Sequence, residues 1–415
     1  MHFPTLARAA PILLIPLWLS SAAAEPLQPG DRVLDRTVSL VEQHFFDTDA
    51  LPAFRATVAD LKAAAAGGAA IDRDEAIAGA LLSLGASHTA RYTQDRVDYY
   101  ELADVFRGAL RRDVRRLFPP EGNVTYEGIG IASRAIGDAV FVTDVYDGGP
   151  ASQAGLMAGD EILAVDGVPF HEIESFTGKA GEIVQLQVRR TADAAPIVVS
   201  VKVERLQPRE AYLEAISDSI RIVEQDGRRV GVVHLWMYTT EEVTQILNSE
   251  LGGGRLKDVD GLVLDLRSRW GGAPADSAEL FVGGTGDMTV TGRDGAVRYV
   301  NTRFDKPVVA VIDEGSRSGM EIYAHALKKN GVPLVGVTTA KAVVAGTAYL
   351  LPDDSLLILA VTDVHVDGER LEGRGVDPDI VVPFDIRYAA GADPQMDAAM
   401  AEMGRVLADE GAGVN

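Results

Sequence analysis

The sequence predicts a multi-domain α/β protein with an N-terminal helical region, a small β domain that contains short helices, and an α/β domain with a mainly parallel sheet. Three patterns of apolar residues support this prediction. Before residue 115, apolar residues recur at helical spacing. Between residues 126 and 203 they form short β runs, and after residue 209 strand-like and helix-like segments alternate. Such alternation is typical of a parallel sheet covered by helices.

The first 24 residues have the composition of a secretory signal peptide. Arg8 precedes an apolar run from Ala9 to Leu19, and small residues lead to a cleavage position after Ala24. The run is too short to cross a membrane. We therefore expect a periplasmic or secreted protein whose mature chain has no membrane span, although an uncleaved signal would tether it.

Composition excludes several classes of function. The chain has 39 basic and 61 acidic residues, a net charge of −22, which argues against nucleic acid and anionic membrane surfaces as partners. It contains no cysteine, so disulfides, thiol catalysis and thiolate metal sites are excluded. The histidines show no metal-ligand spacing, and we expect neither a metal nor a cofactor. His234 lies in an apolar strand pattern, where we expect a core side chain.

The predicted helical domain covers residues 25–118. Its spacing is clearest at Ile77, Leu81 and Leu84, and Gly85 ends that pattern. The tripeptide Ser87-His88-Thr89 follows directly.

The predicted α/β domain covers residues 209–385. Its expected strands are 230–235, 261–266, 308–312, 332–337 and 356–361, and its expected helices follow Thr239, cover 275–281 and run from Met320 to Leu327. Residues 386–415 form a tail in which Met396, Met400 and Met403 allow one more helix.

A serine lies on the sharp turn between the strand 308–312 and the helix that follows it. Ser318 is expected at the helix N-terminus, where backbone N–H groups without helical partners can stabilise an oxyanion. In the alternative interpretation, Ser316 or Ser318 is only an N-cap. Gly271 and Gly272 follow another strand and allow an N–H donor to approach a reacting carbonyl, or else form a plain turn.

An ordered series of glycine motifs marks the β domain. Gly128-Ile129-Gly130-Ile131, Gly149-Pro150-Ala151, Gly159-Asp160-Glu161 and Asp166-Gly167 occur in that order. The series resembles a PDZ domain over residues 124–206. The resemblance implies that residues 128–131 bind the carboxylate of a chain terminus while the peptide adds to the sheet as a strand.

A second series covers nearly the whole mature chain. It runs from Ser87-His88-Thr89 through Asp265-Leu266-Arg267, Gly271-Gly272 and Ser318-Gly319-Met320-Glu321 to Leu371-Glu372-Gly373. With the PDZ match, it resembles the carboxyl-terminal processing (tail-specific) peptidases and their tricorn-like relatives. The resemblance implies a serine endopeptidase with Ser318 as nucleophile and an oxyanion hole formed by Gly319 and by Gly271 or Gly272.

Two candidates compete for the general base. In the processing-peptidase branch the base is a lysine within a Gly-Lys-Gly-like segment, but here Lys341 falls about one position early and the flanking glycines are missing. The tricorn-like branch uses a histidine, which His88 matches, and Glu372 matches the carboxylate that completes the site. A histidine acts as a base near neutral pH without a large pKa change. We therefore expect His88 as the base, with Ser87 and Glu372 orienting it or holding water by hydrogen bonds.

The predicted function is a periplasmic serine endopeptidase that cleaves unstructured polypeptides and recognises their C-termini with the PDZ domain. Two alternatives remain at this point. One is an inactive PDZ peptide-binding protein on a protease-derived scaffold, and the other is a peptidase with a Ser318/Lys341 dyad. The oligomeric state cannot be inferred from these patterns.

Overall fold

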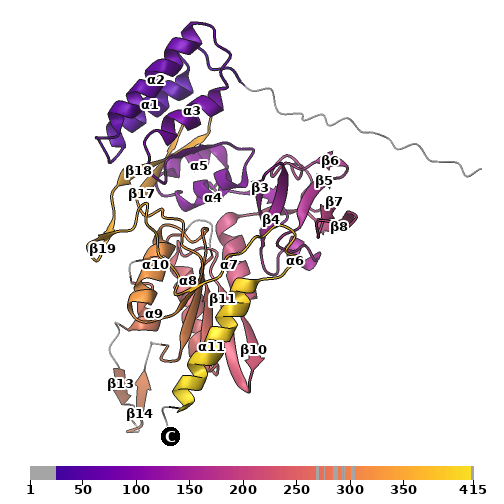
Figure 1. Cartoon of the computed structure of the whole chain (residues 1–415), viewed down its shortest axis with the longest axis vertical. Helices are drawn as coiled ribbons and strands as arrows, with labels where there is room; N and C mark the ends of the chain where they lie inside the picture. Colours follow the sequence, from indigo (N-terminus) through magenta and orange to yellow (C-terminus); the bar gives the residue numbers. More distant parts are fainter. Residues whose placement is uncertain are drawn as a thin grey trace, which may run out of the picture.

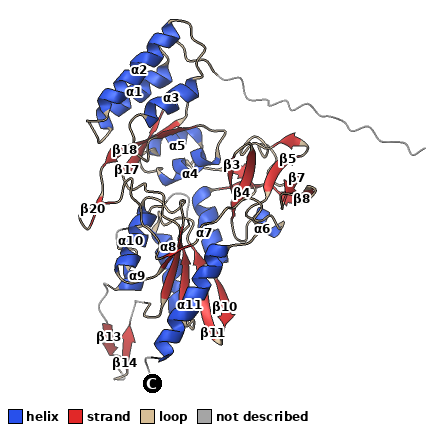
Figure 2. Ribbon diagram, in the orientation of Figure 1, coloured by secondary structure: helices blue, strands red, loops and turns tan. Residues whose placement is uncertain are grey.

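The computed structural model describes residues 25–412 except 268–270, 275, 284–287, 292, 294 and 301–303 (Figure 1). The predicted signal peptide, residues 1–24, lies outside the described residues. Helices predominate up to residue 117, strands predominate in residues 126–206, and the two alternate after that. Figure 2 shows the helices and strands in separate colours.

The N-terminal region is built from five helices and, contrary to a purely helical prediction, one short strand. The helices are α1 (Arg32–His44), α2 (Leu51–Ala66), α3 (Arg73–Leu82), α4 (Val97–Val105) and α5 (Arg111–Leu117). The Asp31 carboxylate caps α1 by accepting hydrogen bonds from two backbone N–H groups, and Asp72 caps α3 in the same way with one. The strand β1 (Ala90–Tyr92) begins two residues after His88.

The strand β18 (Leu356–Thr362) does not join the main sheet, so the prediction for 356–361 was right for the strand and wrong for its place. It pairs with β1 and with β17 (Ala345–Leu350) in a separate three-stranded sheet. Leu357 and Leu359 are buried with Phe54 and Ile77 of the helical region, because their side chains complete its apolar core. A late segment of the chain therefore fixes the region that carries His88.

The region that resembles a PDZ domain, residues 124–206, has the predicted order of short strands. Its main sheet follows the order β3 (Ile131–Ile136), β4 (Ala139–Val145), β5 (Glu161–Val165), β7 (Ile183–Arg189) and β8 (Ile197–Lys202), with β6 (Val168–Pro169) paired to β5. The strands β2 (Tyr126–Gly128) and β9 (Glu204–Leu206) form a separate antiparallel pair, and α6 (Pro150–Gln153) is the short helix of this region. β3 lies at the edge of the sheet.

The α/β region, residues 209–385, contains the predicted, mainly parallel sheet. Its order is β10 (Arg221–Gln225), β11 (Arg228–His234), β12 (Gly261–Asp265), β15 (Val308–Ile312), β16 (Leu334–Gly336) and β21 (Ile380–Val381). All neighbouring pairs are parallel except β10 with β11. β12 is buried at every residue, as expected for a strand covered on both faces.

Helices cover both faces of this sheet (Figure 1). On one face lie α7 (Pro208–Ser219), α8 (Glu241–Gly252) and α10 (Gly319–Lys329), and their buried side chains contact Leu262 and Leu264. On the other lies α11 (Pro394–Ala412), whose Ala399 and Met403 contact Val263. The tail helix allowed by the sequence therefore forms, and it completes the core.

Smaller elements complete the chain. They are α9 (Glu279–Val282), shorter and later than the predicted 275–281, the hairpin of β13 (Met288–Thr291) and β14 (Val297–Val300), and the pair β19 (His365–Val366) and β20 (Glu369–Arg370). None of the helices among the described residues is long and apolar enough to span a membrane.

Candidate active site

Ser318 occupies a strained turn between β15 and α10. Its backbone has φ 57° and ψ −126°, in a region that residues with a side chain rarely adopt. The Ser318 N–H donates to the carbonyl of Ala342 at 2.9 Å, and α10 begins at the next residue. The predicted turn therefore forms, and it is held in a costly conformation of the kind that clusters at functional sites.

Three glycines surround Ser318 closely. A Cβ added to Gly271 would lie 2.9 Å from the Cβ of Ser318, and one added to Gly319 would lie 2.2 Å from the backbone nitrogen of Ala273. Gly271 and Gly272 have φ of 68° and 79°, which favours glycine. The structure therefore brings together the three residues predicted as oxyanion donors, although they are far apart in sequence.

The Glu321 carboxylate stabilises this turn by hydrogen bonds, a role that was not predicted from the sequence. Its side chain is fully buried, and its carboxylate accepts hydrogen bonds from the Thr339 hydroxyl at 2.6 Å and from the backbone N–H groups of Ser318, Lys341 and Ala342 at 3.2, 2.9 and 2.7 Å. Burial raises the pKa of Glu321, and these hydrogen bonds oppose that change. The signal in the sequence was its position three residues after Ser318.

Ser87, His88 and Glu372 form one hydrogen-bonded group. The Ser87 hydroxyl donates to Glu372 Oε2 at 2.9 Å and lies 2.9 Å from His88 Nδ1. Because Ser87 Oγ gives its only hydrogen to Glu372, it accepts from Nδ1–H of His88. This tautomer leaves Nε2 of His88 with a lone pair, as a general base requires.

Glu372 also accepts the N–H of Ser87 at 2.9 Å and that of Val343 at 2.7 Å. Gly346 lies against His88, since a Cβ added there would be 3.1 Å from its Cβ. The segment from Ala342 to Gly346 thus contacts both Ser318 and the His88 group. The described residues form no hydrogen bond between Ser318 and His88, and such bonds commonly tighten only when substrate is bound.

The imidazole of His88 is half-buried, and its charge is disfavoured. Desolvation by burial, and then the positive charge of Arg317, lower the pKa of His88 to about 4, while Glu372 opposes the change. The influence of Arg317, the residue before Ser318, indicates that His88 lies near the nucleophile turn.

Lys341 lies in a different environment. Its side chain is exposed, and its backbone is tied down by Glu321, which accepts its N–H, and by Gly373, which donates to its carbonyl at 2.9 Å. A lysine base must be desolvated to lose its proton near neutral pH. Exposure therefore argues against Lys341 as the base.

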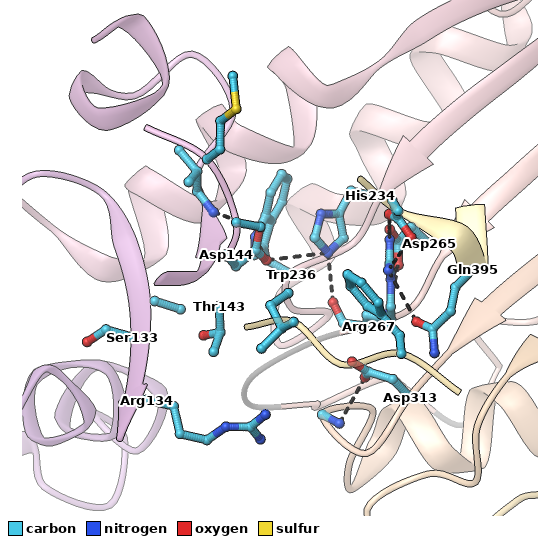
Figure 3. Close-up of a pocket in the computed structure, with 18 of the residues that line it drawn as sticks. Ser133, Arg134, Thr143, Asp144, His234, Trp236, Asp265, Arg267, Asp313 and Gln395 are labelled. Carbon is cyan, nitrogen blue, oxygen red and sulfur yellow. Dashed lines mark hydrogen bonds and ion pairs between the residues drawn. The ribbon is translucent and has the colours of Figure 1, made fainter. Parts of the chain in front are cut away.

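A chamber of about 680 Å³ separates the PDZ strands β3 and β4 from the ends of β11 and β12 (Figure 3). His234 lines it, so the expectation of a core side chain was wrong: Nε2 of His234 lies 2.7 Å from the carbonyl oxygen of Arg267. The Trp236 indole donates to Asp144 of β4 at 2.7 Å, which links the two regions. The chamber is also lined by Arg317, beside Ser318.

The PDZ glycine loop faces a narrow space. The cavity lined by residues 128–133 measures about 10 Å³, too small for a side chain. Glu172 closes it, because its carboxylate accepts from Ser133 Oγ at 3.1 Å, from Arg96 Nε at 3.0 Å and from Val97 N at 3.2 Å. A peptide that adds to the edge strand β3 must displace these contacts.

Within the described residues, no group of three or more histidine, aspartate or glutamate side chains is arranged to hold a metal ion.

Comparisons with known proteins agree with this architecture. Residues 229–382 match Peptidase family S41, and residues 141–190 match the PDZ domain. The chain is 28% identical over 342 residues to a carboxyl-terminal-processing protease of Picosynechococcus sp., covering 75% of this chain and 80% of the relative. It is 25% identical over 323 residues to the carboxy-terminal processing protease CtpA of Bacillus subtilis, covering 70% and 67%.

Among solved structures, the tricorn protease is similar in fold, with a TM-score of 0.50 and 16% identity over 90% of this chain and 36% of that protein.

The matched regions and the fold together define a serine-type peptidase that carries a PDZ domain. Residues 229–382 thus form a region of peptidase family S41, the carboxyl-terminal processing proteases are relatives of the chain, and the resemblance found in the sequence is confirmed.

Proposed function

We propose that this protein is a periplasmic endopeptidase that cleaves unstructured polypeptides, with Ser318 as nucleophile and His88 as general base. The observation that carries the proposal is the hydrogen-bonded chain from Glu372 through Ser87 to Nδ1 of His88, which leaves Nε2 as an acceptor. A second support is the strained turn that presents Ser318 beside three glycines.

In the proposed mechanism, Nε2 of His88 takes the hydroxyl proton of Ser318 as the oxygen attacks the scissile carbonyl. The N–H groups of Gly319 and of Gly271 or Gly272 stabilise the oxyanion. His88 then gives its proton to the leaving amine, and a water molecule, activated by His88, releases the acyl group. Glu372 stabilises the imidazolium through the hydroxyl of Ser87.

We assign substrate capture to the PDZ region, residues 124–206, with Gly128, Ile129, Gly130 and Ile131 receiving a C-terminal carboxylate and β3 pairing with the extended chain. The helical region (25–118) and the catalytic region (209–385) then act as the other two units, and the tail (386–415) supports the latter. Extended backbone is required for pairing, so folded substrates are excluded.

The test is digestion of an unfolded protein by wild type and by Ser318→Ala, with the products identified by mass spectrometry. Cleavage by wild type that disappears in the variant is the expected result. If neither protein cleaves several unfolded substrates while both bind peptide C-termini, the protein is a peptide-binding protein and the proposal fails.

The pH profile of kcat/KM provides a first prediction. Since the pKa of His88 is lowered from 6.5 to about 4, the neutral base persists in weakly acidic solution, and activity should fall only near pH 4. Arg317→Met removes a positive charge that lowers this pKa and should shift the fall to higher pH. A fall near pH 6.5 in wild type, unchanged in the variant, would contradict the account.

The PDZ groove provides a second prediction. Glu172→Gln removes a negative charge beside the proposed carboxylate site and weakens the contacts with Arg96 and Val97. Peptides with a free C-terminal carboxylate should bind about tenfold more tightly, a change of about 1.4 kcal/mol, as measured by fluorescence anisotropy. C-terminally amidated peptides are the control and should gain less; an equal gain would place the carboxylate elsewhere.

A further inference from the structure

A further cavity, of about 180 Å³, lies between α4, the start of α7 and the segment from Met237 to Thr240. It adjoins the proposed oxyanion site. A Cβ added to Gly272 would lie 2.4 Å from Thr239 Cγ2, and one added to Gly271 would lie 2.9 Å from the Cβ of Ser318. The glycine pair therefore lies between Thr239, which lines this cavity, and Ser318.

Asp104 brings a buried hydrogen-bond acceptor to the cavity. Asp104 is only 6% exposed to solvent. Oδ2 accepts the backbone N–H of Arg209 at 3.0 Å, whereas Oδ1 has no hydrogen-bond partner in the described part of the chain. Arg107 Nη1 lies 3.7 Å from Oδ1, which is an ion pair but too long for a hydrogen bond.

Arg209 brings the complementary donor. Its Nε is buried and, within the same described part, also lacks a hydrogen-bond partner. Buried polar groups are normally paired, so one cavity with an unpaired acceptor and an unpaired donor indicates an occupant that supplies both partners.

The charges around the cavity determine which occupant fits. Glu101 and Asp104 face Arg107 and Arg209, so the lining carries two groups of each sign. The Glu101 carboxylate already has hydrogen-bond donors, because the hydroxyls of Tyr146 and Tyr212 donate to its Oε1. A neutral group that donates and accepts at once satisfies Asp104 Oδ1 and Arg209 Nε, whereas an apolar group leaves both unpaired. The Thr240 hydroxyl, which also lines the cavity without a partner among the described residues, can donate or accept. A carboxamide has both functions.

We propose that this cavity is a specificity pocket for an asparagine or glutamine side chain of the substrate, at the residue whose carbonyl is attacked. The inference rests on the proposed function. When that carbonyl lies against Gly271 and Gly272, the side chain on the adjacent Cα extends past these glycines toward Thr239, which lines the cavity. The carboxamide N–H then donates to Asp104 Oδ1, and its oxygen accepts from Arg209 Nε.

The test compares unstructured peptides that differ only at this residue, which is glutamine, methionine or glutamate. The kcat/KM for glutamine should exceed that for the other two by about tenfold or more, because a pocket built for hydrogen bonds discriminates against analogues that lack them. Equal values for glutamine and methionine would show that the cavity holds only water and would overturn the inference.

The Asp104→Asn variant provides a second test, because it should change which substrate residue is preferred. The amide oxygen can still accept the N–H of Arg209, but the acceptor that faces the cavity becomes an N–H donor. Two donors then face the substrate, so the preference should reverse from glutamine to glutamate. Asp95→Asn, the same substitution at an exposed position just before α4, should leave the order unchanged.

The two proposals fail separately. Ser318-dependent cleavage without a glutamine preference removes the specificity pocket alone. Cleavage that persists in Ser318→Ala removes the proposed function. The wild-type comparison decides the inference even if Asp104→Asn does not fold.

Discussion

His88→Ala should lower kcat by about 10⁴-fold, whereas Lys341→Ala should change it by no more than about threefold. The imidazole is held in a base-competent tautomer by Ser87 and Glu372, and the lysine side chain is exposed. Turnover of a labelled unfolded protein at saturating concentration measures both values.

The matched control is His171→Ala, which removes an exposed imidazole and should have no effect on turnover. Both active-site variants should keep the wild-type unfolding transition within a small difference, so that lost turnover reports chemistry. Near-complete loss of turnover in Lys341→Ala with retention in His88→Ala would assign the base to Lys341 and reject the histidine mechanism.

Glu321→Ala should have the second largest effect, on stability and turnover together. The substitution removes the acceptor that four donors share at a fully buried site, and the Ser318 N–H keeps a second acceptor in the carbonyl of Ala342. Each buried donor left without an acceptor costs about 1–3 kcal/mol, so the free energy of unfolding should fall by several kcal/mol. Turnover of the fraction that remains folded should fall by about 10²-fold, because the Ser318 turn loses its support.

Urea denaturation and turnover, measured on the same samples, test this prediction. Glu321→Gln keeps the volume and one acceptor oxygen, so it should lie between wild type and Glu321→Ala. Glu314→Ala, an exposed carboxylate on the same turn, should behave as wild type. Wild-type stability and turnover in Glu321→Ala would show that the network is not what holds the turn.

Much of the fold could be predicted because apolar periodicity and turn residues are local signals. The strand 308–312, the turn at Ser318 and the helix after it follow from a buried run, small residues and helical spacing within about twenty positions. The parallel sheet follows from the alternation of such units.

The place of β18 could not be predicted, because the apolar pattern of a strand does not state which strand it pairs with. Its partner β1 is three residues long and precedes it by more than two hundred and fifty positions. His234 was misassigned for a related reason: strand periodicity gives the face of the sheet, but not that the strand end opens into a chamber.

The order of the motifs in the sequence identified the candidate site residues. It did not identify the carboxylates that stabilise the backbone around the site. Glu321 acts through backbone N–H groups of residues up to 21 positions away, and Asp104 through the start of α7. Backbone donors are present at almost every residue, so the sequence carries no mark of which carboxylate receives them.

The most direct test of the central claim is labelling with a fluorophosphonate, in which an activated serine oxygen bonds to phosphorus and fluoride leaves. After digestion and mass spectrometry, the adduct should lie on Ser318 in wild type and in Lys341→Ala, and should be nearly absent in His88→Ala. An adduct on another serine, or Ser318 labelling that survives His88→Ala and is lost in Lys341→Ala, would contradict the account.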